Sequence, residues 1–184
     1  MMEVIETGLK GCLVLEPQIY NDGRGYFFES YNEKRFQDKT GIEVRFIQDN
    51  QSKSDRGVLR GLHYQSGEYA QAKLVRVIKG KALDVVVDIR PESVTFGKTF
   101  SVILSEENNK QLFVPRGFAH GFSVLENNTI FSYKCDNYYN KASEGGIIYN
   151  DADLNIDWML KQEEVVLSEK DQYLQNFKSL RNEI

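Results

Sequence analysis

The residues best suited to acid–base chemistry in this chain are its two histidines. His63 lies in the segment GVLRGLHYQ (residues 57–65), and His120 lies in VPRGFAHGF (residues 114–122). An unperturbed histidine changes its charge near neutral pH, so both side chains suit proton transfer. A zinc site built from histidine and cysteine needs four ligands, but Cys12 and Cys135 are far apart and form no short ligand pair. Proton transfer without a metal or a cofactor is therefore the leading chemistry that the sequence offers.

Length, charge and cysteine content limit the class of protein. With 184 residues and no repeat or linker, the chain suits one domain, residues 1–184, whose core needs no disulfide. A net charge of -4 with mixed signs gives no basic stripe for nucleic acid. The two distant cysteines are expected to be reduced, and no signal peptide or membrane-spanning apolar run is present. We expect a soluble, cytoplasmic protein without nucleic-acid or membrane partners, although local arginines and lysines permit an anionic small ligand.

The elements that must position the histidines are mostly short strands. Residues Lys73 to Arg90 alternate apolar and polar side chains around Lys79-Gly80-Lys81, which predicts two strands joined as a hairpin. Further β-rich runs, separated by turn residues, are Thr99 to Leu104, Gln111 to Val114, Gly121 to Leu125 and Thr129 to Tyr133. Helical patterns occur only at the margins, at Glu33 to Lys39 and at Glu169 to Phe177. Many short antiparallel strands predict a sandwich or a barrel.

The sequence around His120 resembles a known barrel motif. Pro115-x-Gly117-x-x-His120, placed before an apolar strand, is similar to the second motif of the cupin family, in which the motif histidine points into the barrel. Cupins that hold a metal add His-x-His and a glutamate in their first motif, whereas the corresponding segment here offers only His63. The resemblance implies an all-β, cupin-type double-stranded β-helix (jelly roll) with short marginal helices, and a barrel mouth with isolated imidazoles.

Longer phrases resemble one family in order and spacing over nearly the whole chain. They match the dTDP-4-dehydrorhamnose 3,5-epimerases, and they are Asp22 to Ser30, Phe46 to Ser52, Gly57 to Gln65, Lys73 to Arg76, Asp88 to Arg90, Pro115 to Phe122 and Glu144 to Ile147. The resemblance implies a cofactor-independent enzyme that inverts C3 and C5 of a dTDP-4-keto-6-deoxyhexose, in the biosynthesis of dTDP-L-rhamnose.

The chemistry of that reaction requires three kinds of group. A C–H bond next to a ketone is a weak acid, so a base must remove the proton while a cation or donor stabilises the enolate oxygen. Inversion then needs an acid on the opposite face. The resemblance implies that His63 is the base and Tyr133 the acid, that Lys73 lies near the enolate oxygen with His120 beside it, and that Asp171 orients His63.

The resemblance also implies a set of ligand contacts and a homodimer. Arg24 and Glu29 would reach the nucleotide sugar of a neighbouring subunit, and Tyr139 would stack on thymine. The other implied contacts are Gln48, Asp49, Asn50, Arg60, Glu144 and Lys170. The guanidinium groups of Arg24 and Arg60 suit phosphate because they present paired donors.

Several alternatives remain open at this stage. His63 and His120 also fit ordinary hydrogen-bonded positions, and Tyr133 fits the core. Ser168-x-x-Asp171 resembles a capping box, in which Asp171 would serve a terminal helix and never meet His63. At the level of function, the alternatives are a C3-only epimerase, a 3,4-ketoisomerase, and a non-catalytic cupin that binds sugar nucleotides. A binding module has no need of His63 and Tyr133 together, which favours an enzyme.

Overall fold

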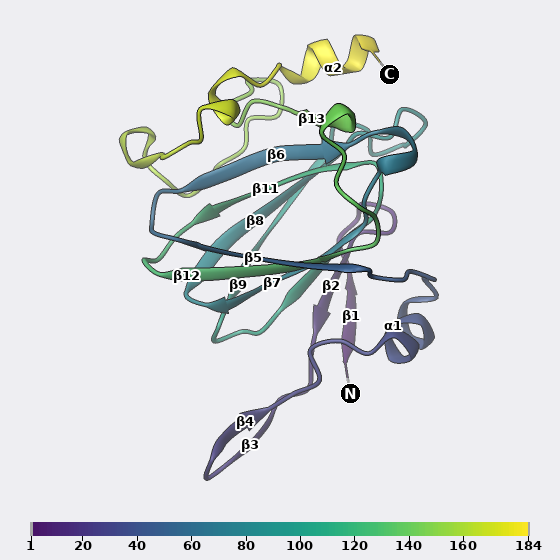
Figure 1. Cartoon of the computed structure of the whole chain (residues 1–184), viewed down its shortest axis with the longest axis vertical. Coiled ribbons are helices and arrows are strands. Elements are labelled where there is room, and N and C mark those ends of the chain that lie inside the picture. The colour runs from purple at the N-terminus through teal and green to yellow at the C-terminus, as the bar shows by residue number, and fades with distance from the viewer. Residues whose placement is uncertain (1, 184) are drawn as a thin grey trace.

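Two antiparallel β-sheets packed face to face form the body of the computed structural model, which describes residues 2–183 (Figure 1). The six-stranded sheet has the order β1-β2-β10-β7-β12-β5. Its strands are β1 (Glu3–Glu6), β2 (Leu13–Glu16), β10 (Gln111–Val114), β7 (Lys73–Lys79), β12 (Thr129–Cys135) and β5 (Gln48–Ser54). The five-stranded sheet contains, in order, β13 (Glu144–Gly146), β6 (Leu59–Gln65), β11 (Phe118–Val124), β8 (Lys81–Asp88) and β9 (Thr99–Ser105). This arrangement confirms the predicted all-β jelly roll.

Among the described residues, three apolar clusters hold the layers together. Side chains such as Val75, Val86 and Phe131 fill the space between the inner faces of the two sheets. Helix α1 (Glu33–Thr40) packs Phe36 against the outer face of the six-stranded sheet. The C-terminal segment covers the outer face of the five-stranded sheet, where Trp158 and other apolar residues are buried (Figure 1).

Helix α1 confirms the helix predicted from Glu33 to Lys39. The side chain of Asn32 accepts a hydrogen bond from the backbone amide of Arg35 at the N-terminus. Gly41 ends the helix with a φ of 69°, a left-handed conformation that favours glycine. A short hairpin of β3 (Tyr20–Asp22) and β4 (Gly25–Phe27) precedes the helix and projects from the body of the protein (Figure 1).

The predicted hairpin between Lys73 and Arg90 is wrong, although its two strands exist. Strand β7 pairs with β10 and β12, and β8 pairs with β9 and β11 in the other sheet. Alternation of apolar residues identifies a strand but not its neighbours. The chain crosses between sheets at Gly80, which has a φ of 77°. This crossing places the side chains of β7 and β8 on facing walls of the core.

The predicted helix from Glu169 to Phe177 is also wrong. A 3₁₀ turn spans Lys170–Tyr173, the backbone at Gln175 then bridges Ile147, and helix α2 begins only at Phe177 and runs to Glu183. The local helical pattern does not prevail here, because the backbone at Gln175 pairs with residues 147–148 and the apolar side chains of this segment are buried against the five-stranded sheet.

No helix in the described part of the chain is long and apolar enough to cross a membrane.

Candidate active site

A cavity of about 600 Å³ is lined by strands of both sheets and by the C-terminal segment. The lining includes many of the residues that the sequence singled out: Asn50, Arg60, His63, Lys73, His120, Tyr133, Lys170 and Asp171. Because His63 stands on β6 and Tyr133 on β12, the imidazole and the phenol come from facing sheets. A ligand held between the sheets therefore meets these two groups from different sides.

A β-bulge in β6 turns two polar side chains toward this cavity. In the pairing with β11, His63 lies opposite His120 and Arg60 lies opposite Phe122, so β6 has one residue more than β11 between these pairs. In a regular strand, Arg60 and His63 would point to opposite faces, but here both line the cavity. A Cβ atom on Gly61 would lie 2.6 Å from the Cα atom of Gly121, so the close approach of the two strands requires glycine.

His63 and Asp171 form a hydrogen-bonded pair inside the cavity. Nε2 of His63 lies 2.5 Å from Oδ1 of the buried Asp171. Burial alone would raise the pKa of Asp171, but the hydrogen bond and the charge of His63, with hydrogen bonds from Ser168 and the Gly61 backbone, hold that pKa below its usual value. The amide of Asp171 is itself bonded to Oγ of Ser168 at 3.2 Å. Ser168 thus accepts a hydrogen bond from the backbone amide within the 3₁₀ turn, while the Asp171 carboxylate is directed to His63.

His120 forms a second imidazole–carboxylate pair, with a residue that the sequence analysis did not select. Its Nε2 lies 2.9 and 3.0 Å from the two carboxylate oxygens of Asp84, which is fully buried. Burial raises the pKa of Asp84, and the positive charges of His120 and Lys73 oppose that rise. The signal in the sequence was a single carboxylate between Leu83 and Val85 in an otherwise apolar run.

Lys73 and Tyr133 are neighbours on the inner face of the six-stranded sheet. Nζ of Lys73 lies 6.0 Å from the centroid of the Tyr133 ring. Burial lowers the pKa of Lys73, and the nearby acidic groups of Cys135, Asp84 and Glu144 oppose this effect. Burial raises the pKa of Tyr133, so its phenol carries a proton at neutral pH.

Three predicted ligand contacts form a network beside the cavity. The hydroxyl of Tyr139 donates to Glu144 at 2.9 Å, and Glu144 forms an ion pair with Lys170. Burial would raise the pKa of Glu144, but the contacts with Lys170 and Tyr139 hold it below its usual value. Gln48 donates to the side chain of Asn50 at 2.9 Å on the neighbouring wall.

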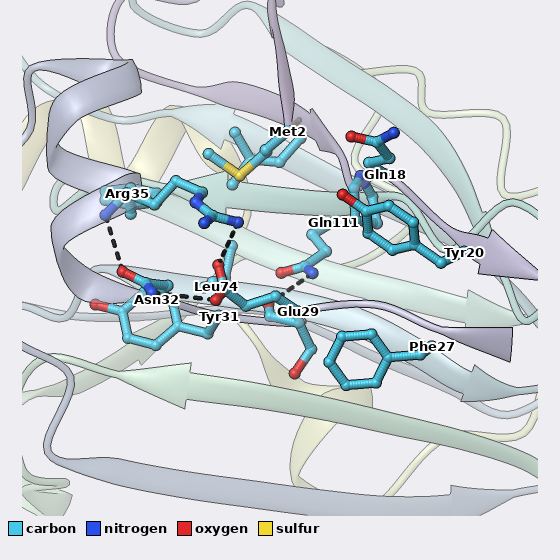
Figure 2. A pocket seen from close by; sticks show the side chains of 14 residues that line it. Met2, Gln18, Tyr20, Phe27, Glu29, Tyr31, Asn32, Arg35, Leu74 and Gln111 are labelled. Carbon is cyan, nitrogen blue, oxygen red and sulfur yellow. Dashed lines mark hydrogen bonds and ion pairs between the residues drawn. The ribbon is translucent and has the colours of Figure 1, made fainter.

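Three other predicted contacts lie away from the cavity within one chain. Arg24 stands on the projecting hairpin with 90% of its side chain exposed, paired with Asp22. Glu29 lines a smaller cavity of about 240 Å³, where it forms an ion pair with Arg35 (Figure 2). Asp49 forms an ion pair with Lys134 and is largely exposed, because strand alternation turns it away from the inner face.

The arrangement fits proton transfer at a carbon next to a carbonyl group. It offers a base oriented by a carboxylate, a protonated phenol on the facing sheet, and the ammonium group of Lys73 as an electrostatic partner for an oxyanion. In residues 2–183, no group of three or more His, Cys, Asp or Glu side chains is arranged to hold a metal ion.

Comparison with known proteins points to one group of sugar-nucleotide enzymes. The sequence profile of the dTDP-4-dehydrorhamnose 3,5-epimerase family matches residues 6–179. The dTDP-4-dehydrorhamnose 3,5-epimerase of Shigella flexneri is 51% identical over 92% of this chain and 93% of its own length. The crystal structure of the corresponding enzyme of Elizabethkingia anophelis has a TM-score of 0.93 and 54% identity, and covers 97% of each chain. A 3,5-epimerase structure from Legionella pneumophila, in complex with dTDP-4-keto-L-rhamnose, has a TM-score of 0.95 and 48% identity over 100% of this chain and 96% of its own.

The charges around Lys73 predict an unusual lysine titration. After reductive ¹³C-methylation, we expect the NMR signal of Lys73 to titrate below the exposed lysines, because burial disfavours the ammonium form. In Asp84→Asn the titration should move to still lower pH, since a nearby negative charge is lost. Lys73→Met identifies the signal. The control is Asp88→Asn, because Asp88 is a buried carboxylate on β8, like Asp84, but it forms its ion pair with Arg90. A signal that ignores Asp84→Asn, or follows Asp88→Asn equally, contradicts the prediction.

Proposed function

The chain belongs to the dTDP-4-dehydrorhamnose 3,5-epimerase family, and we propose that its central cavity converts dTDP-4-keto-6-deoxy-D-glucose to dTDP-4-keto-L-rhamnose in dTDP-L-rhamnose biosynthesis. The observation that carries the proposed mechanism is the placement of His63, paired with Asp171, and of Tyr133 on facing sheets around one cavity. Epimerisation at carbons flanking a ketone needs such a base and acid.

His63 acts as the base. Its Nε2 faces Asp171, which fixes the ring and stabilises the imidazolium that forms when a proton is taken from C3 or C5. The pKa of Asp171 lies below its usual value, so this carboxylate remains charged throughout the neutral range. A general base of this kind contributes roughly 10²- to 10⁴-fold to the rate.

Tyr133 returns a proton to the other face, and Lys73 stabilises the enolate. The raised pKa of Tyr133 keeps the phenol protonated until the carbanion forms beside it. The ammonium of Lys73 and the imidazole of His120 supply positive charge and hydrogen-bond donors for the C4 oxygen, where negative charge develops.

The remaining polar residues bind the nucleotide sugar. We assign contacts with the sugar and the diphosphate to Lys170, Asn50 and Gln48, because Lys170 and Asn50 line the cavity and Gln48 adjoins Asn50. The ring of Tyr139 is exposed beside the cavity, where thymine can stack on it. Glu144 orients the side chains of Tyr139 and Lys170, because it accepts a hydrogen bond from the first and forms an ion pair with the second.

A homodimer accounts for the residues that lie away from the cavity. The projecting hairpin exposes Tyr20, Tyr26 and Phe27, which indicates a surface that another subunit covers. We infer that this hairpin carries Arg24, and the adjoining segment Glu29, to the cavity of a second copy. Asp49 has no contact with the cavity in this arrangement of one chain and is not needed in the mechanism. The cytoplasmic location expected from the sequence is part of the proposal.

Deuterium labelling tests the reaction. In deuterated water, the product should carry solvent deuterium at both C3 and C5, because the abstracted proton exchanges and the returned one comes from an acid in contact with solvent. His63→Ala should lower turnover by at least about 10²-fold. Label at C3 alone would select the C3-only epimerase, and movement of the carbonyl would select the 3,4-ketoisomerase. Binding of the nucleotide sugar without label at either carbon would leave the non-catalytic cupin.

The two roles around Asp171 can be separated by paired variants. Asp171→Asn should reduce kcat by about 10²-fold, a typical scale for acid–base groups, with little change in melting temperature. Ser168→Ala removes the acceptor of the Asp171 amide in the 3₁₀ turn and should lower the melting temperature. Its loss of kcat should be smaller than that of Asp171→Asn, because it removes only one of the hydrogen bonds that the Asp171 carboxylate receives. The dyad is contradicted if Asp171→Asn keeps wild-type kcat while its melting temperature falls.

Mixed dimers test the shared site. Arg24→Ala and His63→Ala subunits are each expected to be impaired alone, but a heterodimer contains one cavity with an intact His63 and an intact Arg24 from its neighbour. Activity should therefore return to a substantial fraction of one wild-type site. Verified heterodimers without recovery would place Arg24 in its own chain's site or outside any site.

A further inference from the structure

Resting on the proposed stacking of thymine on Tyr139, we propose that Gln65 is the positioning residue for that ring. Its side-chain amide holds the backbone on both sides of Tyr139 and thereby fixes the ring relative to His63. Gln65 lies at the end of β6, outside the lining of the central cavity, so it acts through the loop that carries Tyr139.

The amide of the half-buried Gln65 is fully engaged with the backbone of neighbouring loops. Its Oε1 accepts a hydrogen bond from the backbone amide of Asn140 at 2.6 Å, and its Nε2 donates to the carbonyl of Tyr138 at 3.2 Å. Nε2 also donates to the carbonyl of Tyr69 at 3.0 Å. Both N–H donors and the oxygen of the amide are used. Two of these three bonds hold the residues that directly precede and follow Tyr139.

The hydroxyl group of Tyr139 is held at the same end of the sheet. It donates to Glu144 at 2.9 Å, and Glu144 is the residue of β13 that pairs with Gln65 of β6. The backbone around Tyr139 and the tip of its ring are therefore both attached to the end of β6. Although Tyr139 is 55% exposed, these attachments give its ring one orientation.

Strand β6 also carries the base. His63 and Gln65 are two residues apart, so their side chains point to the same side and their Cα atoms are about 7 Å apart. The pairing with β13 runs without a register shift from Gln65 opposite Glu144 to His63 opposite Gly146. One regular piece of strand thus connects the ring that stacks on thymine to the imidazole that takes the proton.

An ordered ring lowers the cost of binding the nucleotide. Residues 136–140 form neither helix nor strand, so the hydrogen bonds of Gln65 take the place of regular structure around Tyr139. A ring that is fixed before the ligand arrives does not have to be ordered on binding, which increases affinity. Loss of Gln65 should therefore weaken the binding of thymine-containing ligands and leave the proton-transfer groups in place.

The experiment compares dTDP with inorganic pyrophosphate, which has no base. In Gln65→Leu, the Kd for dTDP and the KM for the nucleotide sugar should rise about 5-fold or more, the lower end of the range for losing a base–aromatic stack. The Kd for pyrophosphate and kcat should stay near their wild-type values, because the pair of His63 and Asp171 is retained. Gln65→Glu keeps the acceptor for Asn140 but loses both donors, and it should weaken dTDP binding in the same direction.

Two further variants show whether Gln65 acts through Tyr139. Gln65→Leu should add little to the effect of Tyr139→Leu on the Kd for dTDP, because both changes remove the same ordered stack. The matched control is Gln71→Leu. Gln71 donates to the carbonyl of Asn137 at 2.8 Å in the same loop but does not flank Tyr139, so its loss should leave the Kd for dTDP near the wild-type value.

Several outcomes would overturn the inference. They are an unchanged Kd for dTDP in Gln65→Leu, an equal loss of pyrophosphate affinity, additive effects with Tyr139→Leu, and an equal effect of Gln71→Leu. If Gln65→Leu does not fold, an unchanged Kd for dTDP in Gln65→Glu would overturn it as well. An unchanged Kd in Tyr139→Leu would remove the stacking and the inference with it, whereas absence of solvent deuterium in the wild-type product would refute the proposed reaction alone.

Discussion

The close backbone contact between β6 and β11 is the constraint on which the site depends. Gly61 and Gly121 let the two strands approach at the bulge, because any side chain at Gly61 would meet the backbone of its neighbour. The extra residue in β6 changes which face the following side chains occupy. Arg60 and His63 can then share one cavity, while Leu59 and Leu62 remain buried on the opposite face.

The buried leucines connect this bulge to the C-terminal segment. Leu59 and Leu62 belong to the same apolar cluster as Trp158 and Leu180, so the outer face of the five-stranded sheet is where the last third of the chain packs. Backbone bridges from Val58 to Val166 and from Ile147 to Gln175 hold the segment on both sides of Asp171. Apolar burial thus delivers the carboxylate that orients His63, although the two residues are 108 positions apart.

Some charged side chains around the cavity are paired with carboxylates of the protein, and others are left free to contact a ligand. The imidazoles of His63 and His120 have carboxylate partners, which limits the cost of burying them, and the exposed Lys170 is paired with Glu144. Lys73 and Arg60 keep positive charge without such partners in the described residues, at positions that line the same space. A substrate with negatively charged oxygen atoms supplies the anionic partners that Lys73 and Arg60 lack.

The sequence alone predicted the chemistry and determined the local elements. Its resemblance to the epimerase family predicted His63, Lys73 and Tyr133 as a proton-transfer set. Helix α1 followed from Asn32 and Gly41, because capping depends on residues within a few positions of each other. Only the tertiary structure decided the pairing of β7 and β8, the partner of Asp171, and the role of Asp84 as the partner of His120. These outcomes depend on which distant strands lie side by side and on a single extra residue in β6. Local periodicity records which side chains share a face of a strand, but it does not record which strand or segment that face will meet.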